Sequence, residues 1–178
     1  MEIQLQAGED KIVTSKNDVW KKIIITILLI AAVGSALSRF PSNDGIGWYH
    51  SLKQPFFAPA YWMPFVIWPI VYILMGSAAG IIWHIHSKTH NAIVKKKAKI
   101  SLWIFAVHLV FNLLCPILLI SLEAPKIALI DILILNIFIA ILIFQFKKIN
   151  QTASRLLIPY FIWIIYATAL NIAIVALN

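Results

Sequence analysis

Residues 62–83 read WMPFVIWPIVYILMGSAAGIIW, and no residue in this stretch is charged. A helix that crosses a bilayer needs about 20 apolar residues, whereas a spanning strand needs only about 9–11. The stretch therefore predicts a transmembrane helix. Four further apolar stretches of similar length predict four more helices, at about residues 20–38, 100–120, 127–146 and 156–177.

The composition agrees with a membrane-embedded chain. Of the 178 residues, 61% are hydrophobic and 12% charged, whereas a soluble domain is about 45–50% apolar and about 25% charged. Strand-like alternation is absent, which argues against a β-barrel. We expect an all-α integral membrane protein, a five-transmembrane-helix bundle over residues 20–178. Residues 1–19 form a polar extension for which disorder stays open.

The distribution of basic residues predicts the orientation. The chain carries 15 Lys and Arg and a net charge of +8. Twelve of them fall on the N-terminal side of the predicted membrane, and three, Arg39, Lys53 and Lys126, fall on the other side. Cytoplasmic loops are enriched in Lys and Arg, so we expect a cytoplasmic N-terminus and an external C-terminus. Charges that flank apolar blocks favour membrane lipid as a partner and argue against nucleic acid.

Polar residues within the predicted helices have the spacing of an interior face. Ser101, His108 and Asn112 lie on one stripe of the third helix, and Tyr160, Trp163, Ala167 and Asn171 lie on one stripe of the fifth. Asp131 is the only carboxylate within the predicted spans. Such residues serve a ligand site or only bond neighbouring helices, and both readings remain open.

We expect no metal site. His84, His86 and His90 lack carboxylate or cysteine support, and the single cysteine, Cys115, excludes a cysteine cluster. His108 fits a core histidine better than a haem ligand.

The segment 39–61, RFPSNDGIGWYHSLKQPFFAPAY, combines aromatic residues with prolines that restrict the backbone. We expect it to fold as a cap over the mouth of the bundle and to close a small-molecule site. The alternative is an aromatic loop in the membrane interface without a ligand.

Two long motifs resemble the TspO/MBR family of tryptophan-rich sensory proteins and translocator proteins (peripheral-type benzodiazepine receptors). The first is Trp48-Tyr49-x-x-Leu52-x-x-Pro55-x-x-x-Pro59-x-x-Trp62 followed by Trp68, Tyr72 and Met75-Gly76. The second is Arg155-Leu156-Leu157-x-Pro159-Tyr160-x-x-Trp163 followed by Ala167-Thr168-x-Leu170-Asn171.

The resemblance implies a homodimeric membrane receptor or sensor. Its ligands would be porphyrins, including haem and protoporphyrin IX, and related flat apolar molecules, held in a pocket between the five helices; no cofactor is obligatory. The ligand-binding residues implied are Tyr49, Pro59, Trp62, Trp68, Asn112, Asp131, Trp163 and Ala167.

Two other functions remain open. The first is a transporter of porphyrin or of another small hydrophobic molecule. The second is light-dependent porphyrin degradation, which some family members are described as promoting. The chain shows no nucleophile–base pair, so we assign no catalytic residue, and an enzymatic role would have to be photochemical.

Overall fold

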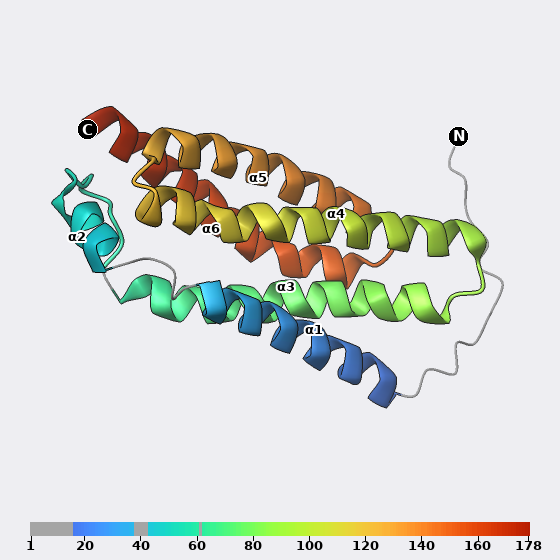
Figure 1. The fold of residues 1–178 in the computed structure, drawn as a ribbon. Coiled ribbons are helices and arrows are strands. Elements are labelled where there is room, and N and C mark those ends of the chain that lie inside the picture. The colour runs from blue at the N-terminus through green and yellow to red at the C-terminus, as the bar shows by residue number, and fades with distance from the viewer. Residues whose placement is uncertain (1–15, 38–42, 61) are drawn as a thin grey trace, which may run out of the picture.

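The computed structural model describes residues 16–37, 43–60 and 62–178, and these residues form six α-helices and no strand. The helices are α1 (Lys16–Leu37), α2 (Asn43–Ser51), α3 (Met63–Lys88), α4 (Ala92–Pro116), α5 (Pro125–Lys147) and α6 (Gln151–Leu177). A short π-helix, η1 (Ile117–Ser121), continues α4. All but α2 and η1 lie lengthwise in one elongated bundle, with α2 across one end (Figure 1).

Five helical segments are long and apolar enough to cross a membrane, which confirms the predicted number. The bounds of these helices differ most from the predicted bounds at α4, which begins at Ala92 instead of about residue 100. The side chain of Asn91 caps this helix by accepting hydrogen bonds from the backbone nitrogens of Ile93 and Val94, at 3.0 and 3.2 Å. The lysines that follow favour helix but lie outside an apolar window, so hydropathy located the end of the apolar stretch and not the end of the helix. Similarly, α1 begins at Lys16; residues 1–15 and 38–42 lie outside the described part.

The main core lies between α3, α4, α5 and α6. Its wholly buried side chains include Met75 on α3, Leu135 and Phe146 on α5, and Leu157 and Tyr160 on α6. Ser101, His108 and Asn112 are also buried, at 0–2% exposure. These three residues form the interior stripe predicted for the third membrane helix, which is α4, and their burial confirms it.

Helix α1 lies at the edge of the bundle and packs along α3. Glycines on α3 allow this close approach, because a Cβ at Gly76 would lie 2.6 Å from the Ile27 Cα, and one at Gly80 would lie 2.6 Å from the Ile23 Cα. The Thr26 hydroxyl donates a hydrogen bond to the Gly76 carbonyl at 2.6 Å. Small residues that bring two backbones together are typical of membrane helix pairs.

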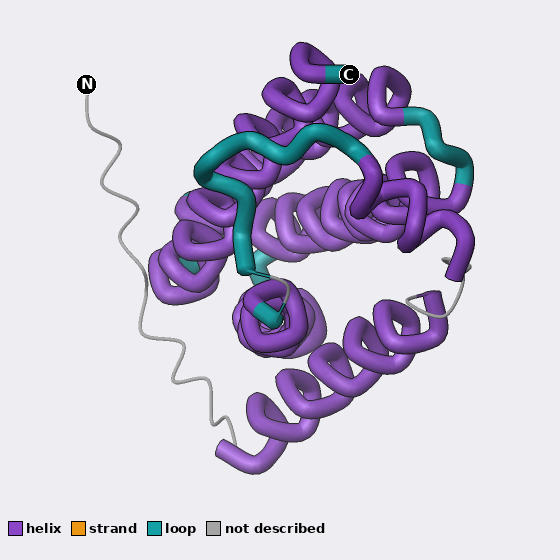
Figure 2. Tube along the Cα trace, turned by 90° about the vertical axis from the view of Figure 1, so that its left-hand side faces the viewer, coloured by secondary structure: helices purple, strands orange, loops and turns teal. Residues whose placement is uncertain are grey.

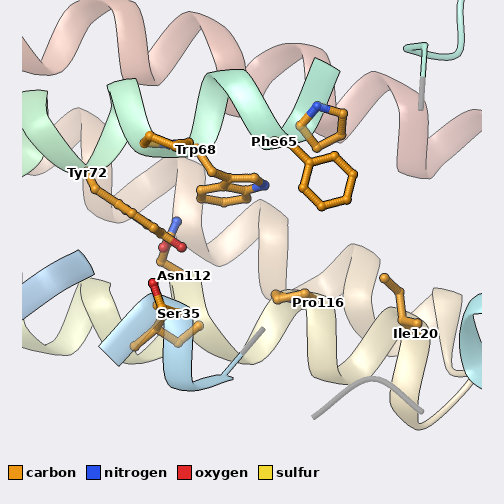
Figure 3. A pocket seen from close by; sticks show the side chains of 11 residues that line it. Ser35, Phe65, Trp68, Tyr72, Asn112, Pro116 and Ile120 are labelled. Atoms are coloured by element: carbon orange, nitrogen blue, oxygen red, sulfur yellow. The ribbon is translucent and has the colours of Figure 1, made fainter. Parts of the chain in front are cut away.

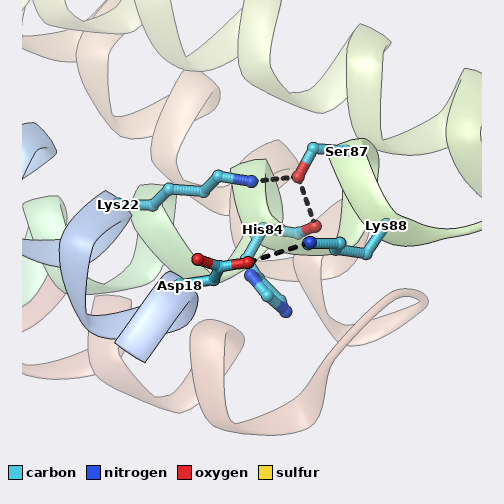
Figure 4. A network of polar contacts seen from close by, with 5 residues as sticks. All are labelled: Asp18, Lys22, His84, Ser87 and Lys88. Atoms are coloured by element: carbon cyan, nitrogen blue, oxygen red, sulfur yellow. Dashed lines mark hydrogen bonds and ion pairs between the residues drawn. The ribbon is translucent and has the colours of Figure 1, made fainter. Parts of the chain in front are cut away.

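Polar contacts join the same two helices at the end opposite α2 (Figure 4). Asp18 forms an ion pair of 2.9 Å with Lys88, and Lys22 donates a hydrogen bond to Ser87. The loops between α3 and α4 and between α5 and α6 lie at this end as well (Figure 1). Most basic residues of the described chain therefore gather at one end of the bundle.

Candidate functional site: two adjoining cavities

The first cavity, here called the membrane cavity, lies between α1, α3 and α4 and has a volume of about 420 Å³. Trp68 and Tyr72 of α3 present their rings to it, 5.7 Å apart between centroids and tilted by 37° (Figure 3). Gly34 and Ser35 contribute the α1 wall, and Asn112, which is buried, contributes a polar group from α4. A side chain at position 34 would collide with the Tyr72 ring, so this glycine leaves room for the aromatic wall.

Asn112 belongs to a buried polar cluster that joins α4 to α6. Its Nδ2 lies 2.8 Å from the Tyr160 hydroxyl oxygen, and His108 Nε2 lies 3.0 Å from the same oxygen. Buried polar groups need such partners, because a donor or acceptor left unpaired costs about 1–3 kcal/mol. The cluster therefore holds Asn112 at the wall of the membrane cavity.

The second cavity, here called the cap cavity, lies under α2 and the segment that follows it, and has a volume of about 480 Å³. Tyr49, His50 and Gln54 give it a polar side, and Pro59 and Ala58 belong to its lining. Burial, and then the neighbouring Tyr166, raise the pKa of the Tyr49 phenol above its ordinary value. The phenol is thus a neutral group at physiological pH.

The cap is fastened to the bundle at three points. Tyr166 of α6 donates a hydrogen bond to the carbonyl of Phe57 at 2.9 Å. The backbone nitrogen of Lys53 donates to the Asn178 side chain at 2.9 Å, and Gly45 of α2 lies directly against the Ile120 carbonyl of η1. The end-on view shows α2 and its loop crossing the bundle end (Figure 2). Residues 43–60, the described part of the segment, therefore form a folded cap, as the prolines and aromatic residues predicted.

The two cavities share part of their walls. Pro64, Phe65 and Ile120 line both of them. The shared residues come from the first turn of α3 and from the π-helix that follows Pro116, so they lie where the cap meets the membrane helices. Each cavity falls within the 300–1,000 Å³ typical of small-molecule sites.

Four of the predicted site residues line these cavities. Tyr49 and Pro59 lie in the cap cavity, and Trp68 and Asn112 lie in the membrane cavity. The structure thus brings the cap motif and the second-helix motif to two adjoining spaces.

The other four predicted site residues lie outside both linings found in the described chain. Trp62 is 61% exposed, and Asp131 is 5% exposed on α5. Trp163 and Ala167 of α6 pack against the core cluster, and the Trp163 ring lies 5.3 Å from the Tyr166 ring between centroids, tilted by 33°. Tyr160 of α6 and Phe105 of α4 are buried in the core cluster, whereas the membrane cavity is lined from α1, α3, α4 and η1 and by no residue of α6.

Sequence reasoning missed several lining residues. Phe65 precedes Trp68 by three positions, which is a helical spacing that could have placed both rings on one face. His50 follows Tyr49 directly and carried no spacing signal. Pro116 is the last residue of α4, and Ile120 lies in the π-helix that continues it, which no pattern in the sequence indicated.

Comparison with known proteins supports the family resemblance that the two sequence motifs indicated. The TspO/MBR family model matches residues 24–177. The tryptophan-rich protein TspO of Archaeoglobus fulgidus is 34% identical over 157 residues, which cover 88% of this chain and 97% of that protein. The protein of the same name from Chlorobaculum tepidum is 31% identical, with 88% and 95% covered. The human translocator protein is 28% identical, with 75% and 76% covered. With its five membrane-spanning helices, the chain is a multi-pass integral membrane protein and belongs to the TspO/MBR family.

Proposed function

We propose that this protein is a membrane receptor or sensor that binds porphyrins and related flat apolar molecules in the two adjoining cavities. The observation that carries the proposal is that an aromatic membrane cavity adjoins a more polar cap cavity, with Pro64, Phe65 and Ile120 lining both. Protoporphyrin IX is flat and apolar over most of its surface and polar at its carboxylates. Its ring suits the side of Trp68 and Tyr72, and its polar edge suits the side of Tyr49 and Gln54.

The rings supply much of the expected affinity. An aromatic pair contributes about 0.5–1.5 kcal/mol beyond the area that it buries, and Trp68 would also lose buried area on truncation. Loss of this side chain should therefore weaken binding about tenfold, the equivalent of about 1.4 kcal/mol.

The test is a titration of the detergent-solubilised protein with protoporphyrin IX, followed by quenching of tryptophan fluorescence. Trp68→Ala should raise the dissociation constant about tenfold. Trp103→Ala is the matched control, because Trp103 is 67% exposed on α4 and lies in neither lining. Absence of saturable quenching in the wild type, or equal losses in the two variants, would refute the proposal.

Trp163→Ala separates two versions of the site. A pocket in the centre of the bundle, as the family resemblance implies, requires Trp163 to contact the ligand. The cavities between α1, α3, α4 and the cap do not include it. A loss smaller than that of Trp68→Ala supports the site toward α1, and an equal loss favours the central one.

The proposal includes an orientation. Lys95, Lys96, Lys97 and Lys99 lie at the start of α4, at the end opposite the cap. The positive-inside rule favours this end in the cytoplasm, with the cap and the C-terminus outside. A C-terminal alkaline phosphatase fusion should therefore be active, and a C-terminal green fluorescent protein fusion dark; the opposite pair of results would reverse the orientation.

A further inference from the structure

The inner face of α2 brings one histidine to the cap cavity. Ile46, Tyr49 and His50 of this helix all line the cavity, and residues three and four positions apart share one face of a helix. Gly45, which lies against the Ile120 carbonyl of η1, belongs to the same face. The face that α2 turns toward the bundle therefore carries His50 to the cavity wall, where the residue is exposed and not sealed in the core.

The other four histidines lie away from both cavities. His84 and His108 are buried, at 6% and 0% exposure. His86, near the end of α3, and His90, in the loop that follows it, lie at the end of the bundle opposite α2 (Figure 1). None of these four belongs to either lining. Among the described residues, His50 is thus the only imidazole in the wall of a cavity.

Hydrogen bonds hold the end of α2 in place around His50. The Gln54 amide donates to the Tyr49 carbonyl at 3.0 Å, and the Ser51 hydroxyl donates to the Trp48 carbonyl at 2.7 Å. The last carbonyls of a helix have no partner within the helix, so these side chains complete its end. His50 therefore lies between neighbours that are fixed in position, which favours metal binding because a ligand must be held in the productive geometry.

The side chains of the cap cavity fit an iron porphyrin through the imidazole. Histidine is the commonest metal ligand and one of the side chains that hold haem iron. Tyrosine can also hold haem iron, and the Tyr49 ring lies 6.0 Å from the His50 ring between centroids. Burial raises the pKa of the Tyr49 phenol, however, and so disfavours the ionised oxygen that would bind the metal. The described lining contains no cysteine or methionine, so His50 is the iron-binding group of this cavity.

We infer that His50 is an axial ligand for the iron of haem in the cap cavity, and that the protein therefore prefers metalloporphyrins with an open axial position to metal-free porphyrins. The inference rests on the proposed function, because it concerns the porphyrin site itself. Ligation draws the iron toward α2, whereas a metal-free porphyrin has no bond to His50 and depends on the wall of Trp68 and Tyr72. The imidazole thus distinguishes two ligands that are otherwise alike.

Two porphyrins that differ only by the metal test this preference: haem, as Fe(III) protoporphyrin IX, and metal-free protoporphyrin IX. Titrations of the detergent-solubilised protein at about pH 8 keep ordinary imidazole groups in the neutral form that binds metals. Quenching of tryptophan fluorescence measures both affinities. The wild type should bind haem about tenfold more tightly than protoporphyrin IX, the equivalent of about 1.4 kcal/mol.

His50→Ala should reduce this preference toward one, because it removes the only bond to the iron. The ratio of the two affinities within one variant corrects for any general effect of the substitution on the site. His90→Ala is the matched control, since His90 is exposed and lies in neither lining, and it should retain the preference. Equal binding of the two porphyrins by the wild type, or a preference that survives in His50→Ala, would overturn the inference.

A spectroscopic measurement identifies the iron ligand directly. Electron–nuclear double resonance of haem bound to protein that carries ¹⁵N-labelled histidine detects the coupling of a ligating imidazole nitrogen to the iron. The coupling should appear in the wild type and in His90→Ala and be absent from His50→Ala. Its absence from the wild type, or its persistence in His50→Ala, would show that His50 does not hold the iron.

The two porphyrins together distinguish the two proposals. Saturable binding of protoporphyrin IX without a preference for haem refutes the ligation by His50 alone. Failure of both porphyrins to bind refutes the proposed function and, with it, the ligation.

Discussion

Gly76→Ala should separate α1 from α3 and destabilise the bundle. The added methyl group would lie 2.6 Å from the Ile27 Cα and 2.8 Å from the Ile27 nitrogen, both atoms of the α1 backbone, where ordinary contacts begin at 3.4 Å. A backbone cannot yield by rotating as a flexible side chain does. The helices must therefore move apart by about 0.8 Å along this contact.

The magnitude follows from three contributions. Insertion of a methyl group into a packed interface costs about 1–3 kcal/mol. The hydrogen bond from Thr26 to the Gly76 carbonyl, now 2.6 Å, would lengthen to about 3.4 Å and forfeit up to about 0.6 kcal/mol, the average for membrane helices. Alanine returns about 1 kcal/mol of helix propensity. We expect a net loss of about 0.6–2.6 kcal/mol in the free energy of unfolding.

Reversible unfolding with sodium dodecyl sulfate in mixed micelles, followed by circular dichroism, measures this loss. Gly47→Ala is the matched control, because a Cβ at Gly47 in α2 would meet no described atom within 4 Å. That variant should be as stable as the wild type or slightly more stable. If Gly76→Ala is no less stable than Gly47→Ala, the close approach of α1 to α3 is refuted.

Three further results are expected. The pKa of Tyr49 is raised, so its neutral form stabilises the fold below about pH 10, and this contribution is lost as pH rises through the folded-state pKa. Between about pH 9 and about pH 11, the melting temperature should therefore fall further for the wild type than for Tyr49→Phe. Parallel curves for the two proteins would contradict this. Asn136 donates a hydrogen bond of 2.7 Å to Thr168 across α5 and α6, so a double-mutant cycle of Asn136→Leu and Thr168→Val should give a coupling of about 0.6 kcal/mol, against zero if the contact is absent. Asp18→Asn should leave the unfolding midpoint unchanged, because both partners of the Asp18–Lys88 ion pair are more than a third exposed; a shift as large as that of Gly76→Ala would show that the pair matters.

Three of the predicted site residues that line the cavities come from one local stretch of the chain. Tyr49 and Pro59 lie in the cap, and Trp68 lies on the helix that follows it, so their relative positions are largely set by chain connectivity. Trp163 is more than 90 residues further along the chain, and its position depends on how α6 packs. Trp163 packs against the core cluster that contains Tyr160 and Phe105, and that outcome depends on three-dimensional packing which helical spacing does not contain.

The amino-acid sequence by itself determined that five helices cross a membrane, because lipid offers no hydrogen bonds to the backbone and each apolar stretch must satisfy its own. It also determined the interior face of α4, since residues at helical spacing share one side whatever surrounds them. Only the tertiary structure decided where the hollow lies, which side chains wall it and that His108, Tyr160 and Asn112 meet in one cluster. These features arise from contacts between helices distant in sequence, where glycines permit close approach and large rings prevent it.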